Sequence, residues 1–261
     1  MLLLFKKNLV ISRQKGFSLV ELSVVVAVIG VIVAAVISVK QIYDSAKIRR
    51  ISTEITSYVS SANTFRQEYG YWPGDLPQAV AFWTATPKSG VNVTNGNGDN
   101  VITLDVWQNN EDLYSWAHLS GSELIPERTY SGLVSDVGVN HYTAGVNIPV
   151  SVAFKNMVFS FFSFIVTEDN YIYKEIGGVK LRVSGLDNVG RPWNNANSLA
   201  AKQVQAIDVK IDDGNADSGN LITHTDVGGS CTTAPYNAPA ARYNLSSTAK
   251  DCIMEFYLDR F

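Results

Sequence analysis

The chain has 261 residues and a net charge of −3; 46% of its residues are hydrophobic, 17% are charged and 11% are aromatic. This composition excludes a disordered polyanion, a collagen and a repeat solenoid, and it predicts a folded protein. The first 16 residues carry four basic side chains and no acidic one, so their removal would take the net charge to −7. An acidic chain with no basic, aromatic-rich stripe does not favour nucleic acid as its main partner.

Residues 17–39 form an apolar segment in which Glu21 is the only charge. At ~1.5 Å per residue, a helix of this length crosses the ~30 Å hydrocarbon core of a bilayer. A cleaved secretory signal is the alternative, but its apolar region is usually only ~7–15 residues long and ends at a small-residue cleavage site. The positive-inside rule leaves the orientation open, because four basic residues precede the segment and four follow it. They are Lys6, Lys7, Arg13 and Lys15 before it, and Lys40, Lys47, Arg49 and Arg50 after it.

The helix is predicted to run on to about Tyr69, because the first proline is Pro73 and Gly30 is the only glycine between Phe17 and Gly70. Apolar residues recur every three or four positions along its second half: Ile48, Ile51, Ile55, Tyr58, Ala62, Phe65 and Tyr69. The residues predicted to face water are Arg49, Arg50, Ser52, Thr53, Glu54, Ser57, Ser60, Ser61, Arg66 and Glu68. This spacing predicts an amphipathic helix that packs against the protein's own head, with a coiled-coil dimer seam as the alternative.

The carboxylate of Glu21 is costly inside a bilayer, so it either reaches the head groups or meets a free amine. The residues Lys15-Gly16-Phe17-Ser18-Leu19-Val20-Glu21-Leu22 resemble the processing site of type IV prepilins and of the pseudopilins of type II secretion. In that family a membrane-embedded aspartic peptidase cuts after the glycine, on the cytoplasmic side, and methylates the new amine. The basic leader, the apolar segment and the amphipathic continuation extend the resemblance over about 55 residues.

The resemblance implies a division of the chain into a leader peptide at 1–16, a long helix at 17–72 and a globular head at 73–261. Within the helix, 17–39 would form the transmembrane segment and filament core, and 40–72 the amphipathic part. Gly16 would precede the cut and Phe17 would become the methylated N-terminus. The amine of Phe17 would neutralise Glu21 of a neighbouring subunit and so set the register of assembly.

The same resemblance implies a location and a set of partners. The leader would stay in the cytoplasm, and the head would lie outside the bacterial inner membrane before the subunit enters a pilus or pseudopilus. The partners would be identical or related pilin subunits, prepilin peptidase, the assembly platform of a pilus or of type II secretion, and the membrane before assembly. The output would be mechanical, such as adhesion, motility or the pushing of a secreted substrate.

The head has enough residues for one α+β domain. Residues 73–110 are predicted to be rich in loops. The predicted elements that follow are a helix at 111–119, strands at 156–167, 171–176 and 179–183, a helix at 199–209 and a strand at 253–258. Turns at 168–170 and 177–178 predict that the first three strands form an antiparallel meander. This agrees with the pilin-like plan of a long helix packed on an antiparallel sheet.

Cys231 and Cys252 are the only cysteines of the chain. In an exported protein this pattern predicts one disulfide, and in a cytosolic protein it predicts two free thiols. Many type IV pilins carry a C-terminal disulfide loop, so the resemblance favours the bond.

Two segments rich in Asn, Asp and Gly have alternating oxygen side chains, as in the first half of a calcium loop. The candidate ligands are Asn95, Asn97 and Asp99 in the first segment, and Asp213, Asn215 and Asp217 in the second. Neither segment has the acidic residue expected at the twelfth position, where Val106 and His224 stand. Glu111 could complete the first site, and Asp208 and Asp212 could assist the second. Solvated turns are the alternative for both segments, so the prediction is no cofactor beyond a structural calcium ion.

The sequence offers no sign of catalysis. The three histidines, His118, His141 and His224, are scattered, and no GxSxG, GxxxxGK, HExxH or CxxC motif is present. The predicted function is therefore that of a structural filament subunit. The alternative is an anchored binding or catalytic domain, outside the cytoplasm, that is not part of a filament.

Overall fold

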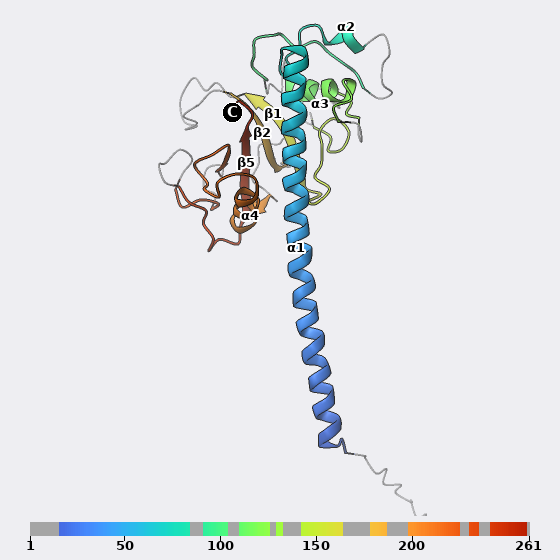
Figure 1. Cartoon of the computed structure of the whole chain (residues 1–261), viewed down its shortest axis with the longest axis vertical. Coiled ribbons are helices and arrows are strands. Elements are labelled where there is room, and N and C mark those ends of the chain that lie inside the picture. The colour runs from blue at the N-terminus through green and yellow to red at the C-terminus, as the bar shows by residue number, and fades with distance from the viewer. Residues whose placement is uncertain are drawn as a thin grey trace, which may run out of the picture. The chain divides into compact units, whose positions relative to one another are not determined.

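The computed structural model describes residues 16–83, 91–103, 110–125, 129–132, 142–163, 178–186, 198–224, 230–234 and 241–259. The chain divides into two compact units, Met1–Ser45 and Ala46–Phe261, with the boundary inside the first helix. The helices are α1 (Leu19–Tyr69), α2 (Ala79–Trp83), α3 (Glu111–Gly121) and α4 (Ala201–Ile211) (Figure 1). The strands are β1 (Met157–Ser163), β2 (Val179–Gly185), β3 (Leu199–Ala200), β4 (Leu221–His224) and β5 (Lys250–Tyr257).

In the unit Met1–Ser45, α1 is apolar on every side. Every Leu, Val and Ile side chain from Leu19 to Val39 is at least half exposed. By length and composition, α1 can cross a membrane. A helix that exposes apolar side chains all round needs lipid or other helices around it.

In the unit Ala46–Phe261, the apolar stripe of α1 packs into the core of the head, as predicted. Ile51, Ile55 and Phe65 are fully buried. The helix ends as predicted at Gly70, whose φ is +79° and whose N–H bonds to the carbonyl of Arg66 at 2.9 Å. Glycine reaches this left-handed conformation without steric cost.

The prediction of a water-facing side was wrong for Ser52, Glu54 and Ser61, which are at least nine-tenths buried. These residues flank the stripe, and the head covers a wider arc of α1 than the stripe alone. Their polar atoms are bonded inside the head, since Ser61 Oγ donates to the carbonyl of Leu124 at 2.9 Å and Glu54 Oε2 accepts from Ser151 Oγ at 2.6 Å.

The sheet is antiparallel throughout and has β5 near its centre. The strand order is β1-β2-β5-β3, and β4 also pairs with β5. β1 pairs with β2 over its whole length, from Met157↔Gly185 to Ser163↔Val179. The predicted meander placed a strand at 171–176 between these two strands. Because β1 and β2 pair directly, that arrangement is wrong. Residues 171–176 themselves lie outside the described part of the chain.

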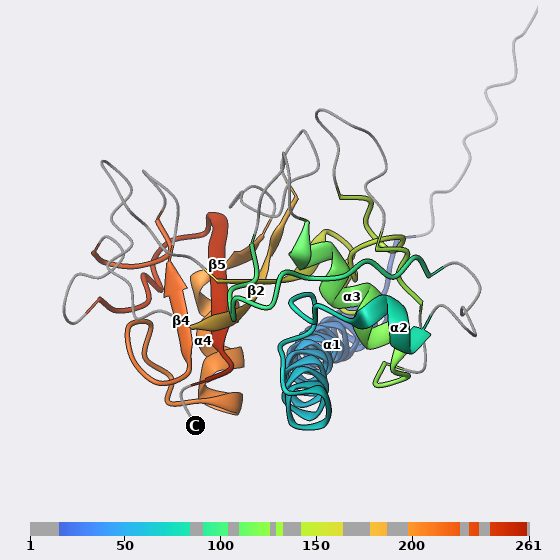
Figure 2. The ribbon, with the colours of Figure 1, turned by 90° about the horizontal axis from the view of Figure 1, so that it is seen from above.

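One face of the sheet is apolar and packs against α1 and α3, which lie side by side when viewed from above (Figure 2). Tyr58 of α1 meets Phe159 edge-on with ring centroids 4.9 Å apart, and Trp116 of α3 lies 4.7 Å from Phe161. These contacts confirm the predicted α+β plan of a long helix on an antiparallel sheet.

The opposite face of the sheet carries a buried ion cluster. Arg182 of β2 and Glu255 of β5 are cross-strand partners, with Nη2 and Oε1 2.6 Å apart. Lys180 Nζ lies 3.6 Å from the other carboxylate oxygen of Glu255. All three side chains are at least nine-tenths buried, so loss of the Glu255 carboxylate would leave two buried cations without their shared acidic partner.

Several elements were predicted only approximately. α3 starts at Glu111 as expected, but α4 starts at Ala201 because Leu199 and Ala200 first pair with β5 as β3. The short elements α2 and β4 were not predicted, because four or five residues show no clear periodicity.

Candidate functional site

The N-terminal motif lies at the start of α1. Gly16, Phe17 and Ser18 precede the helix and are exposed, Phe17 by 88%. Ser18 Oγ accepts the N–H of Val20 at 3.3 Å, and the N–H of Ser18 donates to Glu21 Oε2 at 2.9 Å. This reciprocal pair is a capping box, which stabilises a helix that begins after Ser18. The Gly16–Phe17 peptide bond therefore lies outside the helix, in an exposed segment.

The first predicted calcium segment folds around Asp75, which the sequence analysis did not include. Carboxylate oxygens of Asp75, Asp99 and Glu111 all lie within 4.8 Å of one another. Asp75 accepts backbone N–H bonds from Gly98 at 2.7 Å, Asp99 at 3.0 Å and Asn100 at 2.9 Å. Burial raises the pKa of Asp75 to about 6, although the N–H groups of Asn100 and Gly98 act to lower it.

Glu111 binds the backbone of the same segment, as expected if it completes the first predicted site. Its two carboxylate oxygens accept the N–H groups of Asn97 and Thr103, each at 3.0 Å. Asn95 Oδ1 accepts the N–H of Val80 at 2.8 Å, outside the carboxylate cluster. Asn97 Nδ2 donates to Asp99 Oδ2 at 2.9 Å. The carboxylates thus organise the loop through its own amides; Val106 lies outside the described residues.

His118 holds this loop to α3 and is fully buried. Its Nδ1 accepts the N–H of Gly74 at 2.9 Å, and its Nε2 lies 2.8 Å from the carbonyl of Thr94. Burial lowers the pKa of His118 to about 4. The ring therefore links two backbone segments in its neutral form. His141 lies outside the described residues, and His224 ends β4.

The second predicted calcium segment forms a turn between α4 and β4. Asp208, Asp212 and Asp213 bring carboxylate oxygens within 4.8 Å of one another, whereas the Asp217 carboxylate is not part of this group. Asn215 and Asp217 are exposed. Burial raises the pKa of Asp208 to about 6, against the hydrogen bond that it accepts from the hydroxyl of Tyr243 at 2.6 Å.

The other two carboxylates shape the turn. Asp212 Oδ2 accepts the N–H of Leu221 at 2.7 Å. Asp213 accepts the N–H of Asn215 at 2.8 Å and the hydroxyl of Ser218 at 2.6 Å. Asp208 and Asp212, which were predicted to assist the second site, lie in this cluster. Calcium binding itself stays a prediction.

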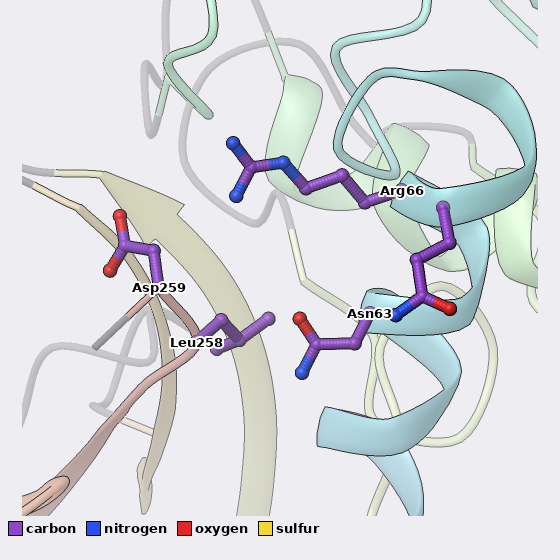
Figure 3. Close-up of a pocket in the computed structure, with 5 residues that line it drawn as sticks. Asn63, Arg66, Leu258 and Asp259 are labelled. Atoms are coloured by element: carbon purple, nitrogen blue, oxygen red, sulfur yellow. The ribbon is translucent and has the colours of Figure 1, made fainter. Parts of the chain in front are cut away.

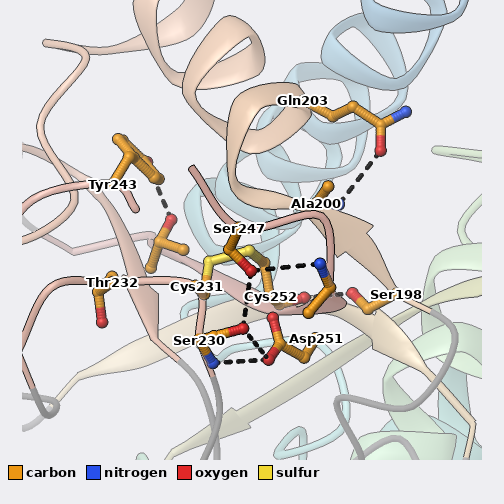
Figure 4. The surroundings of a disulfide bond; sticks show 12 residues. Ser198, Ala200, Gln203, Ser230, Cys231, Thr232, Tyr243, Ser247, Asp251 and Cys252 are labelled. Carbon is orange, nitrogen blue, oxygen red and sulfur yellow. Dashed lines mark hydrogen bonds between the residues drawn. A yellow bond between two sulfur atoms is a disulfide. The ribbon is translucent and has the colours of Figure 1, made fainter. Parts of the chain in front are cut away.

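Cys231 and Cys252 form the disulfide and are fully buried (Figure 4). Cys252 belongs to β5, so the bond fastens the preceding loop to the centre of the sheet. The hydroxyl of Ser198 donates to the carbonyl of Cys252. Asp251 Oδ2 accepts the N–H of Ser230 at 2.7 Å, beside Cys231. The bond and its polar surroundings hold the C-terminal part of the head.

A groove of about 420 Å³ lies between α1 and the end of β5, lined by Asn63, Arg66, Gln67, Leu258 and Asp259 (Figure 3). The Arg66 guanidinium lies 4.2 Å from the centre of the Trp72 ring. The five lining residues include an amide pair, a cation and an acid. They include no serine, cysteine or histidine.

These features define a pilin-like architecture: an apolar N-terminal helix, an amphipathic continuation and a head with an antiparallel sheet and a C-terminal disulfide. The family model described as the prokaryotic N-terminal methylation motif matches residues 11–37. The chain thus carries the prepilin-type cleavage and methylation motif, and together with the apolar helix this motif fits a type IV pilin-like precursor. Comparisons with curated proteins and with solved structures gave no match.

Proposed function

We propose that this chain is the precursor of a structural subunit of a type IV pilus or of a type II secretion pseudopilus. The observation that carries the proposal is the methylation motif at residues 11–37, placed at the start of a helix that is apolar and exposed on every side. Such a helix needs lipid or other helices around it. In a subunit that is stored in the membrane and then assembles into a filament, lipid surrounds this helix first and the helices of other copies surround it afterwards.

The processing step follows from the position of the motif. Prepilin peptidase would remove the leader 1–16 by cutting after Gly16, and Phe17 would become the methylated N-terminus. The exposed, non-helical state of Gly16, Phe17 and Ser18 supports this step. With the leader in the cytoplasm, the head of the single-pass subunit lies outside the inner membrane.

Glu21 would set the register of assembly. Cleavage creates a cationic amine at Phe17, four residues before the Glu21 carboxylate. Either charge alone is costly in an apolar environment, whereas a pair between neighbouring subunits compensates both. Parallel helices would then stop sliding at the stagger that brings the amine of one copy to Glu21 of the next.

The mass of the mature protein tests this proposal. The full chain would be expressed with prepilin peptidase, and the membrane-extracted product would be analysed by intact mass spectrometry. The expected mass is that of 17–261 with one internal disulfide and one added methyl group. A Gly16→Val variant is expected to keep the leader, because the family's peptidase cuts after glycine.

Two other results would contradict the proposal. An intact N-terminus in the presence of the peptidase, or a cut at a conventional signal site, would support the alternative of an anchored domain outside the cytoplasm. Equal processing of the parent and of Gly16→Val would place the cut elsewhere.

A further inference from the structure

A group of three cations lies on the part of α1 that belongs to the head. Lys47, Arg49 and Arg50, here called the basic turn, fall within four residues. Lys47 Nζ lies 5.3 Å from the centre of the Phe154 ring, and Arg49 and Arg50 are exposed. Arg50 Nε lies 3.3 Å from Glu54 Oε1. Arg49 therefore places positive charge at the surface of the head, whereas Arg50 is paired with Glu54.

Arg50, the last residue of the basic turn, lines a cavity of about 310 Å³. The wall formed by α1 is polar and includes Thr53 and Ser57, whereas the opposite wall is apolar. The apolar wall consists of Leu124, Ile125, Val150 and Val152, with Tyr130 beside them, and Tyr58 of α1 also lines the cavity. We call this cavity and the basic turn together the basic pocket.

The charge of Glu54, which also lines the basic pocket, is compensated internally. Its Oε2 accepts the hydroxyl of Ser151 at 2.6 Å, and its Oε1 accepts the N–H of Val152 at 3.0 Å and faces Arg50. The pocket therefore has a cationic rim and one apolar wall, which suits an apolar side chain with an acidic neighbour.

The chain itself carries a surface of that kind in the segment from α4 to β4. Residues 208–217 contain four aspartates and one lysine, and we call this segment the acidic turn. Val209 is 65% exposed and packs against Gly214, beside the exposed Asp213. Asp217 is exposed in the same turn. The exposed apolar side chain of Val209 therefore belongs to a turn that also exposes the acidic side chains of Asp213 and Asp217.

The two surfaces lie on opposite sides of the head. In Figure 1, α4 lies on one side of α1 and the green segments that follow α3 lie on the other. A contact between two unlike surfaces on opposite sides is heterologous and repeats from copy to copy, giving a ring if the rotation closes and a helical filament if it does not. This is the kind of contact that a filament needs.

We propose that the acidic turn of one copy docks into the basic pocket of a second copy, with Val209 against the apolar wall and the acidic side chains near Arg49 and Arg50. The inference rests on the proposed function, because the filament is what places copies side by side. Another possible occupant of the basic turn is an anionic lipid head group, which such cations attract near a membrane.

Disulfide cross-linking in isolated filaments tests the contact. The full chain with Thr53→Cys and Val209→Cys would be assembled and oxidised, and the products separated on a non-reducing gel. The expected result is a ladder of covalent oligomers, because each copy carries both partners of the contact. The native Cys231–Cys252 bond is buried and internal to one chain, so it does not contribute to the ladder.

Thr64→Cys with Val209→Cys is the matched control. Thr64 is an exposed threonine on the same helix, 11 residues further along and thus roughly 16 Å away. It is expected to give no ladder. The contact would be overturned if the protein with Thr53→Cys and Val209→Cys forms filaments but gives no ladder. Equal ladders from this protein and from the control would also overturn it. A parent that is not processed and forms no filaments would overturn the proposed function as well.

Charge reversal distinguishes a protein contact from a lipid contact. Arg49→Glu and Asp217→Arg each change an exposed side chain, and each is expected to lower the filament yield severalfold. The double variant is expected to restore it, because the two charges then match again. A loss with Arg49→Glu that Asp217→Arg does not restore would support lipid binding and overturn the contact.

Discussion

Glu21 has different partners in a single chain and in the proposed filament. In the single chain its carboxylate accepts the N–H of Ser18 at 2.9 Å and completes the capping box of α1. In the filament the same carboxylate would pair with the amine of Phe17 from a neighbour. Hydrogen bonding at the helix start needs only an acceptor, whereas the pairing needs a charge.

Two variants of Glu21 separate these roles. Glu21→Gln keeps an acceptor for the N–H of Ser18 without the charge, and Glu21→Ala removes both. We expect both variants to insert in the membrane and neither to enter filaments, because each leaves the amine of the neighbour without its carboxylate. The measurement is the amount of subunit in the membrane fraction and in sheared filaments. Normal assembly of Glu21→Gln would show that charge pairing does not set the register.

Asp112, the second residue of α3, is only 1% exposed. Burial raises its pKa to about 7, although the neighbouring Tyr142 side chain acts to lower it. An acid whose pKa is higher in the folded than in the unfolded state makes stability fall as pH rises between the two values. Asp75 and Asp208 act in the same direction, whereas His118, with its lowered pKa, makes stability fall as pH drops below about 6.5.

We expect Asp112→Asn to raise the free energy of unfolding at pH 8 by roughly 1–3 kcal/mol, because it removes a buried charge. The difference should shrink towards pH 4, where the aspartate is protonated in the folded protein. Urea unfolding of both proteins across this pH range is the measurement, with the exposed Asp217→Asn as control. A difference that does not depend on pH would contradict the explanation.

At the scale of elements, the second half of α1 is held by the head rather than by helix propensity alone. Ile55 is fully buried in the stripe, whereas Ser60 on the same helix is exposed. Ile55→Ala should lower the free energy of unfolding by about 2–5 kcal/mol because it leaves a cavity. Ser60→Ala should change it by less than about 0.5 kcal/mol. Urea unfolding monitored by tryptophan fluorescence compares the two, and equal effects would contradict the packing described for α1.

Hydrogen bonds cover parts of two outer strands of the sheet, β1 and β4. On β4, the N–H of Leu221 donates to Asp212 Oδ2 at 2.7 Å and that of Thr223 to the carbonyl of Ala216 at 2.9 Å. On β1, the N–H of Ser163 donates to the carbonyl of Ile102 at 2.8 Å. Covered edges disfavour strand pairing between heads, so contacts between copies depend on side chains.

The disulfide is expected to stabilise the C-terminal part of the head. The cysteines are 21 residues apart, and a loop of about this size corresponds to ~3 kcal/mol of unfolding free energy in the chain-entropy description. A variant with both Cys231→Ser and Cys252→Ser should lose about this amount in urea unfolding. The parent in reductant should approach the variant, and equal stability of parent and variant without reductant would contradict the role of the bond.

At the scale of the whole head, two acidic clusters tie segments together that are far apart in the chain. Asp75, Asp99 and Glu111 connect the segment after α1 with α3, and Asp208 connects α4 to Tyr243. Each cluster lies at a segment that the sequence predicts to bind calcium, and that prediction needs a direct test.

If calcium binds, the midpoint of thermal unfolding should rise in calcium relative to chelator, because a ligand of the folded state stabilises it. Asp99→Asn should reduce the rise if the first segment binds, and Asp213→Asn if the second one does. Differential scanning fluorimetry of the full protein in detergent makes the comparison, with magnesium as the control ion. A midpoint that calcium and chelator leave unchanged would reject both sites.

The sequence by itself determined the long helix, its two halves, the motif at Gly16, Phe17 and Glu21, and the α+β class. These features are local: a run without breakers, a spacing of three and four, and a short motif. The disulfide was predictable once an exported protein was inferred, because no other cysteine competes for the pairing.

Only the tertiary structure decided which polar residues are buried and which segments meet. Asp75 joins Asp99 and Glu111 because the chain after α1 folds back on α3, and no local pattern records that return. Glu54 looks like a surface residue of an amphipathic helix, yet residues about 100 positions later supply its hydrogen bonds. The pairing of β1 with β2 likewise depends on long-range register. Burial and long-range contacts depend on the whole packing, whereas periodicity and motifs are properties of neighbouring residues.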